Sequence, residues 1–122
     1  MPFRDPTLSL RDISEAISMI ERFTLGMNFD AYREDLKTMA AVERKLLLIS
    51  EAAVRLGEEG PALCPGLPWE NIRGIGNWLR HQYDRVDVET VYRTVREDLP
   101  ALKAGVQRAL SVSMKPDSPS PS

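Results

Sequence analysis

The chain has 122 residues, of which 43% are hydrophobic and 28% are charged, and its formal net charge is −2. These values are typical of one globular domain with a hydrophobic core, and they argue against a protein that coats nucleic acid through bulk positive charge. A single cysteine, Cys64, excludes an internal disulfide. With only one histidine beside it, a zinc site is a poor expectation, so we expect neither a metal nor another cofactor.

The first predicted element is an amphipathic helix. Apolar residues recur at spacings of three or four between Leu10 and Phe23. Asp5 or Thr7 is suited to cap the start of this helix, and Gly26 is expected to end it.

Two further helices are predicted before the middle of the chain. Asn28 is expected to cap a short helix with apolar residues at Phe29, Tyr32 and Leu36. A long helix follows from Met39 to Leu56, closed by the glycines at positions 57 and 60.

Residues 57–67 are rich in glycine and proline and predict a loop. Pro68 suits the first turn of the next helix, where its missing N–H costs nothing. Gly74 and Gly76 lie inside that helix although each costs about 1 kcal/mol relative to alanine, so they indicate close backbone approach.

The last predicted helix follows a turn at residues 84–86. Asp87 is expected to cap it, and its apolar positions run from Val88 to Leu110. Pro100 should kink or split it after Glu97. The pattern predicts an all-α, up-and-down bundle of about five helices in residues 1–114 and a disordered Pro/Ser tail in residues 115–122.

The N-terminus has no apolar signal core, and the longest apolar run, Leu46–Ile49, is too short to span a bilayer. We therefore expect a cytoplasmic protein with no membrane partner.

The only histidine, His81, lies in a polar stripe on the helix that follows Pro68. On a helical wheel with Arg73 at zero, this stripe holds Asn77 at ~40°, His81 at ~80° and Arg80 at ~340°. Imidazole moves a proton near neutral pH, guanidinium holds phosphate, and an amide orients a hydroxyl, so these groups suit metal-free cleavage of RNA at its 2′-hydroxyl. From the wheel alone, an ordinary solvated helix face is the favoured interpretation.

Ordered matches along nearly the whole chain indicate a family. They include Leu10-Arg11-Asp12-Ile13, Phe23-Thr24-Leu25-Gly26-Met27, Ala41-Val42-Glu43-Arg44, Leu67-Pro68-Trp69, Ile72-Arg73-Gly74, His81-Gln82-Tyr83 and Asp98-Leu99-Pro100. From Leu8 to Leu110 the chain resembles the HepT-like toxins of the HEPN (higher eukaryotes and prokaryotes nucleotide-binding) superfamily.

This resemblance implies a helical bundle that forms homodimers and acts on RNA. The ribonuclease motif of the family is Arg-Asn-x-x-x-His-x-Tyr, which makes His81 the catalytic histidine and Asn77 the polar residue after the motif arginine. The expected partner is a minimal nucleotidyltransferase antitoxin, which adenylylates the motif tyrosine, here Tyr83.

The chain departs from the family pattern at two positions. Gly76 occupies the slot of the motif arginine, and Ser50 stands where a glycine is expected before Glu51. Arg80, on the same side of the wheel as the lost slot, is the first candidate to replace the arginine, and Arg73 is the second.

Two functions follow from this pattern. The first is the toxin of a toxin–antitoxin pair, an endoribonuclease that cleaves RNA without metal at a cleft shared by two copies of the chain. The alternative is a catalytically weakened HEPN dimer that binds nucleotide or the nucleotidyltransferase without cutting RNA. In the second case Gly76→Arg should create or raise activity.

Overall fold

The computed structural model describes residues 5–80 and 87–114, and every regular element within them is a helix. Four longer helices form the body of the molecule: α1 (Pro6–Phe23), α3 (Leu36–Leu56), α5 (Trp69–Arg80) and α7 (Leu99–Met114). The predicted turn at residues 84–86 and the predicted tail at residues 115–122 lie outside the described residues.

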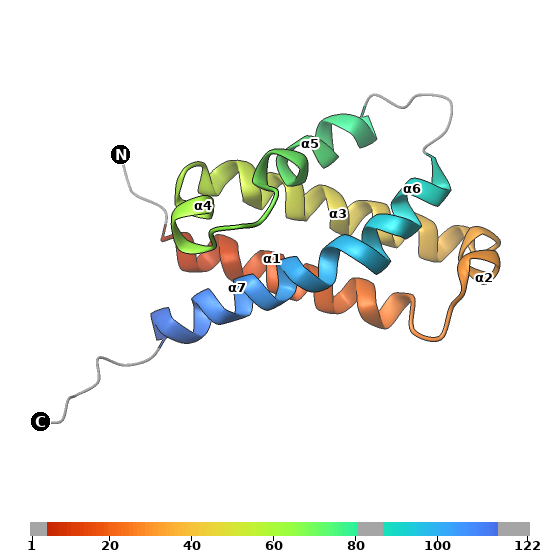
Figure 1. Ribbon diagram of the computed structural model, residues 1–122. Coiled ribbons are helices and arrows are strands. Elements are labelled where there is room, and N and C mark those ends of the chain that lie inside the picture. The colour runs from red at the N-terminus through yellow and green to blue at the C-terminus, as the bar shows by residue number, and fades with distance from the viewer. Residues whose placement is uncertain (1–4, 81–86, 115–122) are drawn as a thin grey trace, which may run out of the picture.

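Successive long helices run in opposite directions, so the chain forms an up-and-down bundle (Figure 1). α1 packs against both α3 and α7, and α5 packs on α3. Two five-residue helices, α2 (Phe29–Arg33) and α4 (Glu59–Leu63), lie at opposite ends of the bundle. This arrangement confirms the predicted all-α bundle.

Local capping signals were sufficient to locate several helix ends. The Asp5 carboxylate accepts the N–H of Thr7 at 2.9 Å, so Asp5 rather than Thr7 caps α1. Asn28 caps α2 through the N–H of Ala31 at 2.8 Å. Gly57 ends α3 with φ of 53°, a backbone conformation in the left-handed half of the map that favours glycine.

Three expectations for the first half of the chain were wrong. Leu36 does not belong to the short helix; it is the first residue of α3 and is 76% exposed. Residues 57–67 are not entirely loop, because they contain α4. Gly60 lies inside α4, where a Cβ would be 3.1 Å from the Trp69 ring, so it permits close packing of α4 on that indole instead of closing α3.

The last predicted helix is not split after Glu97; its backbone stays helical from Val88 to Met114 and contains a π-helical turn just before Pro100. α6 (Val88–Arg93) runs into a π-helical turn, Thr94–Asp98, and α7 begins directly after it. Proline lacks an N–H and crowds the preceding turn, and the wider π turn accommodates both defects.

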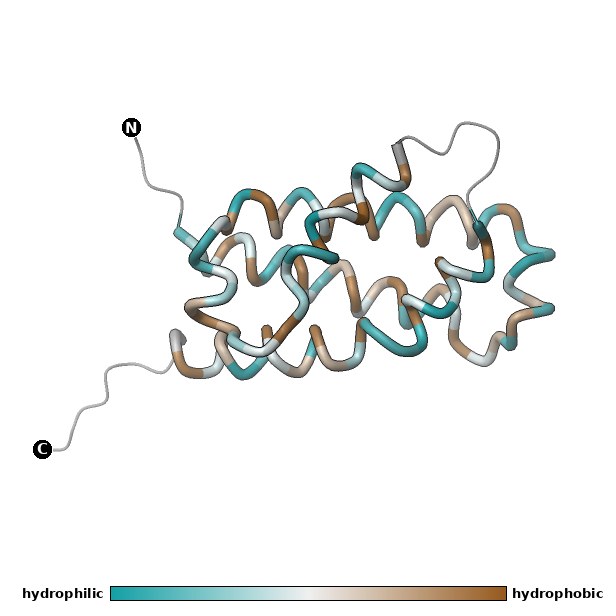
Figure 2. Tube along the Cα trace, turned by 45° about the horizontal axis from the view of Figure 1, so that its top comes forward, coloured by the Kyte–Doolittle hydropathy of each residue, from teal (hydrophilic) through white to brown (hydrophobic). Residues whose placement is uncertain are grey.

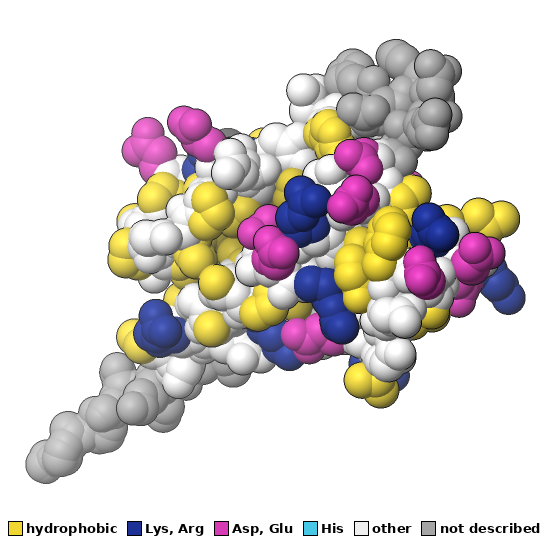
Figure 3. Space-filling view, turned by 45° about the vertical axis from the view of Figure 1, so that its right-hand side comes forward, with side chains coloured by type: hydrophobic (Ala, Val, Ile, Leu, Met, Phe, Trp, Pro, Cys, Tyr) yellow, Lys and Arg dark blue, Asp and Glu magenta, His cyan; other side chains and the backbone are white. Residues whose placement is uncertain are grey.

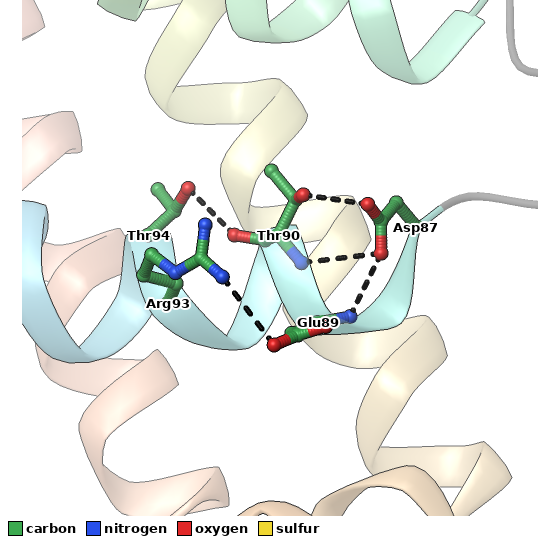
Figure 4. A network of polar contacts seen from close by, with 5 residues as sticks. All are labelled: Asp87, Glu89, Thr90, Arg93 and Thr94. Atoms are coloured by element: carbon green, nitrogen blue, oxygen red, sulfur yellow. Dashed lines mark hydrogen bonds and ion pairs between the residues drawn. The ribbon is translucent and has the colours of Figure 1, made fainter.

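A polar network fixes the start of α6 (Figure 4). The Asp87 carboxylate accepts the N–H of Glu89 at 3.2 Å and the hydroxyl of Thr90 at 2.7 Å. One turn later, Arg93 pairs with Glu89 at 3.4 Å. The predicted cap at Asp87 is confirmed.

The core lies where α1, α3 and α7 meet. Hydrophobic and hydrophilic residues alternate along the longer helices (Figure 2). The completely buried residues include Leu10, Ile13, Ile17, Ile20, Val42, Leu46, Ile49 and Val106. Each such side chain contributes about 1.5–3 kcal/mol of burial free energy. Among residues 5–80 and 87–114, no helix is long and apolar enough to cross a membrane.

Two leucines of α3 test this account of the core. Leu46 is completely buried and Leu36 is 76% exposed. Leu46→Ala should lower the free energy of unfolding by about 2–5 kcal/mol because it leaves a cavity. Leu36→Ala, the control on the same helix, should change it by less than about 0.5 kcal/mol. Urea titration measures both, and equal effects would contradict the assigned burial.

The helix caps predict an acid-sensitive stability. The N–H of Thr38 lowers the pKa of Asp35, the α3 cap, and the Thr90 hydroxyl lowers the pKa of Asp87. In the unfolded chain both carboxyls titrate near pH ~3.9. Their stabilising contribution is therefore present above about pH 4 and is lost as the pH falls through the lower folded-state pKa values.

Replacing both caps with asparagine keeps the capping hydrogen bonds and removes the titration. The Asp35→Asn/Asp87→Asn variant should lose less stability than the wild type between pH 5 and pH ~2.5, as measured by urea midpoints at each pH. A wild-type pH dependence in the variant would show that these carboxylates do not contribute in this way.

Candidate functional site

One face of α5 is held firmly against the bundle. Trp69, at the start of the helix, is 4% exposed and donates its indole N–H to the carbonyl of Cys64 at 2.9 Å. Ile72, 5% exposed, follows on the same face, and its N–H bonds to the carbonyl of Pro68 at 3.0 Å. Pro68 therefore precedes the helix at a position where no N–H is needed, close to the place predicted for it.

α5 approaches α3 closely at Gly76. A Cβ at this position would lie 2.7 Å from Oγ of Ser50 and 3.3 Å from a methyl of Leu47, so the space is already filled from α3. The N–H of Gly76 donates to Oγ of Ser50 at 2.9 Å. The same hydroxyl donates to the carbonyl of Arg73 at 2.7 Å.

The two glycines of α5 have different roles. Gly74 is exposed, and a Cβ there would meet nothing within 4 Å. The prediction of close backbone approach is therefore confirmed at Gly76 and wrong at Gly74.

Arg73, a candidate phosphate ligand, is directed along α3. Its Nη2 donates to the carbonyl of Gly57 at 2.9 Å, where α3 ends. A guanidinium there complements the partial negative charge of the helix C-terminus. Its Nε is buried and has no partner among residues 5–80 and 87–114. The described contacts of Arg73 thus join α5 to α3.

Asn77 is the described member of the polar stripe that is open to solvent. It follows the buried Gly76 directly in the sequence. Arg80 is the last residue of α5, one helical turn further along, and its side chain is not described. His81 and Tyr83 lie outside the described residues.

A third face of α5 borders a groove of about 420 Å³ between α5, the π-helical turn and α7. Ile75 and Trp78 line it from α5, and Leu99 and Leu102 line it from α7. Its charged lining residues are both acidic, Glu70 and Asp98, so this groove does not suit a phosphate backbone.

Other charges on the surface are mixed. On the face drawn in Figure 3, acidic and basic side chains are interspersed with exposed hydrophobic ones. This face therefore carries no continuous basic surface of the kind that would bind nucleic acid through bulk charge.

The single cysteine is unsuited to nucleophilic chemistry. Cys64 is 4% exposed, and burial raises the pKa of its thiol even though Arg108 acts in the opposite direction. A buried thiol with a raised pKa is a weak nucleophile.

The structure defines an all-α protein in which one helix, α5, presents a polar outer face. Comparison with known proteins identifies its class. The family model described as "Ribonuclease HepT-like" matches residues 13–109. The chain therefore belongs to the ribonuclease HepT-like family.

Relatives match over most of their own length. The chain is 38% identical over 99 residues to the "Probable ribonuclease HepT" of Thermococcus cleftensis, covering 81% of this chain and 90% of that protein. It is 34% identical over 100 residues to the "Putative RNase MJ0127" of Methanocaldococcus jannaschii, covering 82% and 83%. No solved structure was found to match the chain.

The two positions at which the resemblance predicts departures from the family pattern, 50 and 76, contact each other. Ser50, in place of the expected glycine, fills the space that a side chain at position 76 would need. The sequence pattern gives these as two separate positions, and the contact between Ser50 and Gly76 joins them. The sequence signal for this contact was the pair of glycines within one helix. It predicted that another element lies close to that helix, but it did not show that the element is α3.

The two glycines of α5 provide a matched test. Gly74→Ala should stabilise the protein by about 0.5–1 kcal/mol, because alanine favours the helix and meets no neighbour. Gly76→Ala should destabilise it by about 1–3 kcal/mol, because the new Cβ overlaps Oγ of Ser50. Thermal and urea unfolding measure both variants, and equal shifts would contradict the close contact between α3 and α5.

Proposed function

We propose that the protein is an endoribonuclease that cleaves RNA without a metal ion, acting as the toxin of a toxin–antitoxin pair. The observation that carries this proposal is the HepT-like match over residues 13–109, which includes the whole of α5. Two copies of the chain form the active unit, with their polar stripes facing each other across a shared cleft. A minimal nucleotidyltransferase is the antitoxin, and Tyr83 is the residue that it adenylylates.

In the proposed reaction the 2′-hydroxyl oxygen of the substrate attacks the adjacent phosphorus. His81 accepts the proton of this hydroxyl, the bond from phosphorus to the 5′-oxygen breaks, and an imidazolium returns a proton to that oxygen. The side chain of Asn77 orients the attacking hydroxyl. The two histidines of a dimer allow one to act as base and the other as acid.

A cation is also needed to hold the charge that develops on the phosphate. We assign this role to Arg80 rather than Arg73. The guanidinium of Arg73 already donates to the carbonyl of Gly57, so using it would break the contact that ties α5 to the end of α3. Arg80 follows Asn77 by three residues and is thus on the same side of the helix.

The alternative function, a dimer that binds nucleotide or the nucleotidyltransferase without cutting RNA, is favoured by one observation. The slot of the motif arginine is Gly76, which is buried against Ser50 and has no room for a side chain. For the same reason Gly76→Arg alone does not test this alternative, because the substitution would disturb the packing of α5 before it could supply a cation.

Cleavage of RNA by purified protein in EDTA tests the proposal. The wild type should cleave single-stranded RNA, and His81→Ala and Arg80→Ala should each lower kcat by about 100-fold or more. Arg73→Ala should lower the unfolding temperature but keep kcat within about threefold when assayed well below that temperature.

Each result has a distinct meaning. Cleavage that survives His81→Ala would eliminate the role of that histidine. A loss of kcat in Arg73→Ala with Arg80→Ala active would reverse the assignment of the arginines. If the wild type cleaves no RNA and is harmless when expressed alone, the binding function replaces the enzymatic one.

A further inference from the structure

Ser50 uses both hydrogen-bonding capacities of its hydroxyl on a single turn of α5. It is 2% exposed, donates to the carbonyl of Arg73 at 2.7 Å and accepts the N–H of Gly76 at 2.9 Å. One bond requires a carbonyl and the other requires an N–H. Both bonds therefore form together only at one rotation of α5 about its axis and one position of α5 along α3.

The surrounding contacts make this arrangement specific. Any side chain at Gly76 would meet Oγ of Ser50 at 2.7 Å, so the hydroxyl reaches the backbone only because that position is glycine. A second attachment lies further along α3, where Arg73 bonds to the carbonyl of Gly57 at 2.9 Å. Two separated attachments restrict both the rotation and the tilt of α5.

We propose that Ser50 is a positioning residue: its hydroxyl sets the rotation of α5 on α3 and thereby the direction in which α5 presents Asn77. This inference rests on the proposed ribonuclease function.

The size of the effect follows from helix geometry. A rotation of about 20° displaces groups at the ~5 Å radius of the helix surface by nearly 2 Å. Misplacement of catalytic groups by about 1 Å is enough to slow a reaction as much as 100-fold. Ser50 therefore affects the reaction although its hydroxyl is buried between two helices and faces away from the outer side of α5.

Two variants separate positioning from simple packing. Ser50→Ala removes the hydroxyl and keeps the Cβ. Ser50→Gly/Gly76→Ala moves the Cβ from α3 to α5, which keeps the number of side-chain carbons and removes both bonds to the hydroxyl. In the double variant the helix-propensity changes oppose each other, and the new Cβ at position 76 no longer meets a serine Oγ.

Both variants should unfold within a few degrees of the wild-type temperature and yet have kcat reduced by about tenfold or more, with KM within about twofold. Residual dipolar couplings of the α5 amides, which report helix orientation, should no longer fit the wild-type orientation, while those of α1 still do. Ser9→Gly is the control: Ser9 is a buried helix serine on α1 that bonds to Arg55, and this variant should keep the wild-type kcat.

Wild-type kcat in both Ser50 variants, or an unchanged orientation of α5, would overturn the positioning role while leaving the ribonuclease proposal intact. A wild-type protein that cleaves no RNA would overturn the proposed function, and the catalytic role of Ser50 with it.

Discussion

The rest of the site depends on one contact, the close approach of α5 to α3 at Gly76. Side chains usually hold packed helices 8–10 Å apart, and a glycine lets a neighbouring side chain reach the helix backbone instead. Here that side chain is Ser50, whose hydroxyl both donates to and accepts from one turn of α5. Because this contact fixes the rotation of α5, it also fixes where the other side chains of the helix lie. Asn77 is turned to solvent, and Ile75 and Trp78 are turned to the groove beside α7.

The fold was predictable wherever local signals decide it. The caps at Asp5, Asn28 and Asp87, the positive φ of Gly57 and the π-helical turn before Pro100 each depend on a few neighbouring residues. α4 was missed because it has no periodicity of its own: it is five residues long, and its Gly60 packs on the ring of Trp69, a tertiary contact. Leu36 was misplaced because an exposed leucine imitates an apolar repeat.

The sequence predicted which residues lie on the outer face of α5, but it did not predict the contacts that the residues of α5 make with α3. A helical wheel gives the direction in which each Cβ leaves the axis, and it correctly placed Asn77 on the outer face. It placed Arg73 there as well, but a long side chain can carry its guanidinium several ångströms from that direction, here to the carbonyl of Gly57. The wheel also treated Gly74 and Gly76 alike, because only the position of α3 distinguishes them.

The contact also bears on the prediction that Gly76 occupies the slot of a motif arginine. A side chain at position 76 and one at position 50 compete for the same space, so a serine on α3 requires a glycine on α5. If the chain cleaves RNA as proposed, the cation for the phosphate therefore comes from a residue that does not face α3. Arg73 is engaged with the end of α3. In the proposed ribonuclease this role is assigned to Arg80, which follows Asn77 by three positions in the sequence.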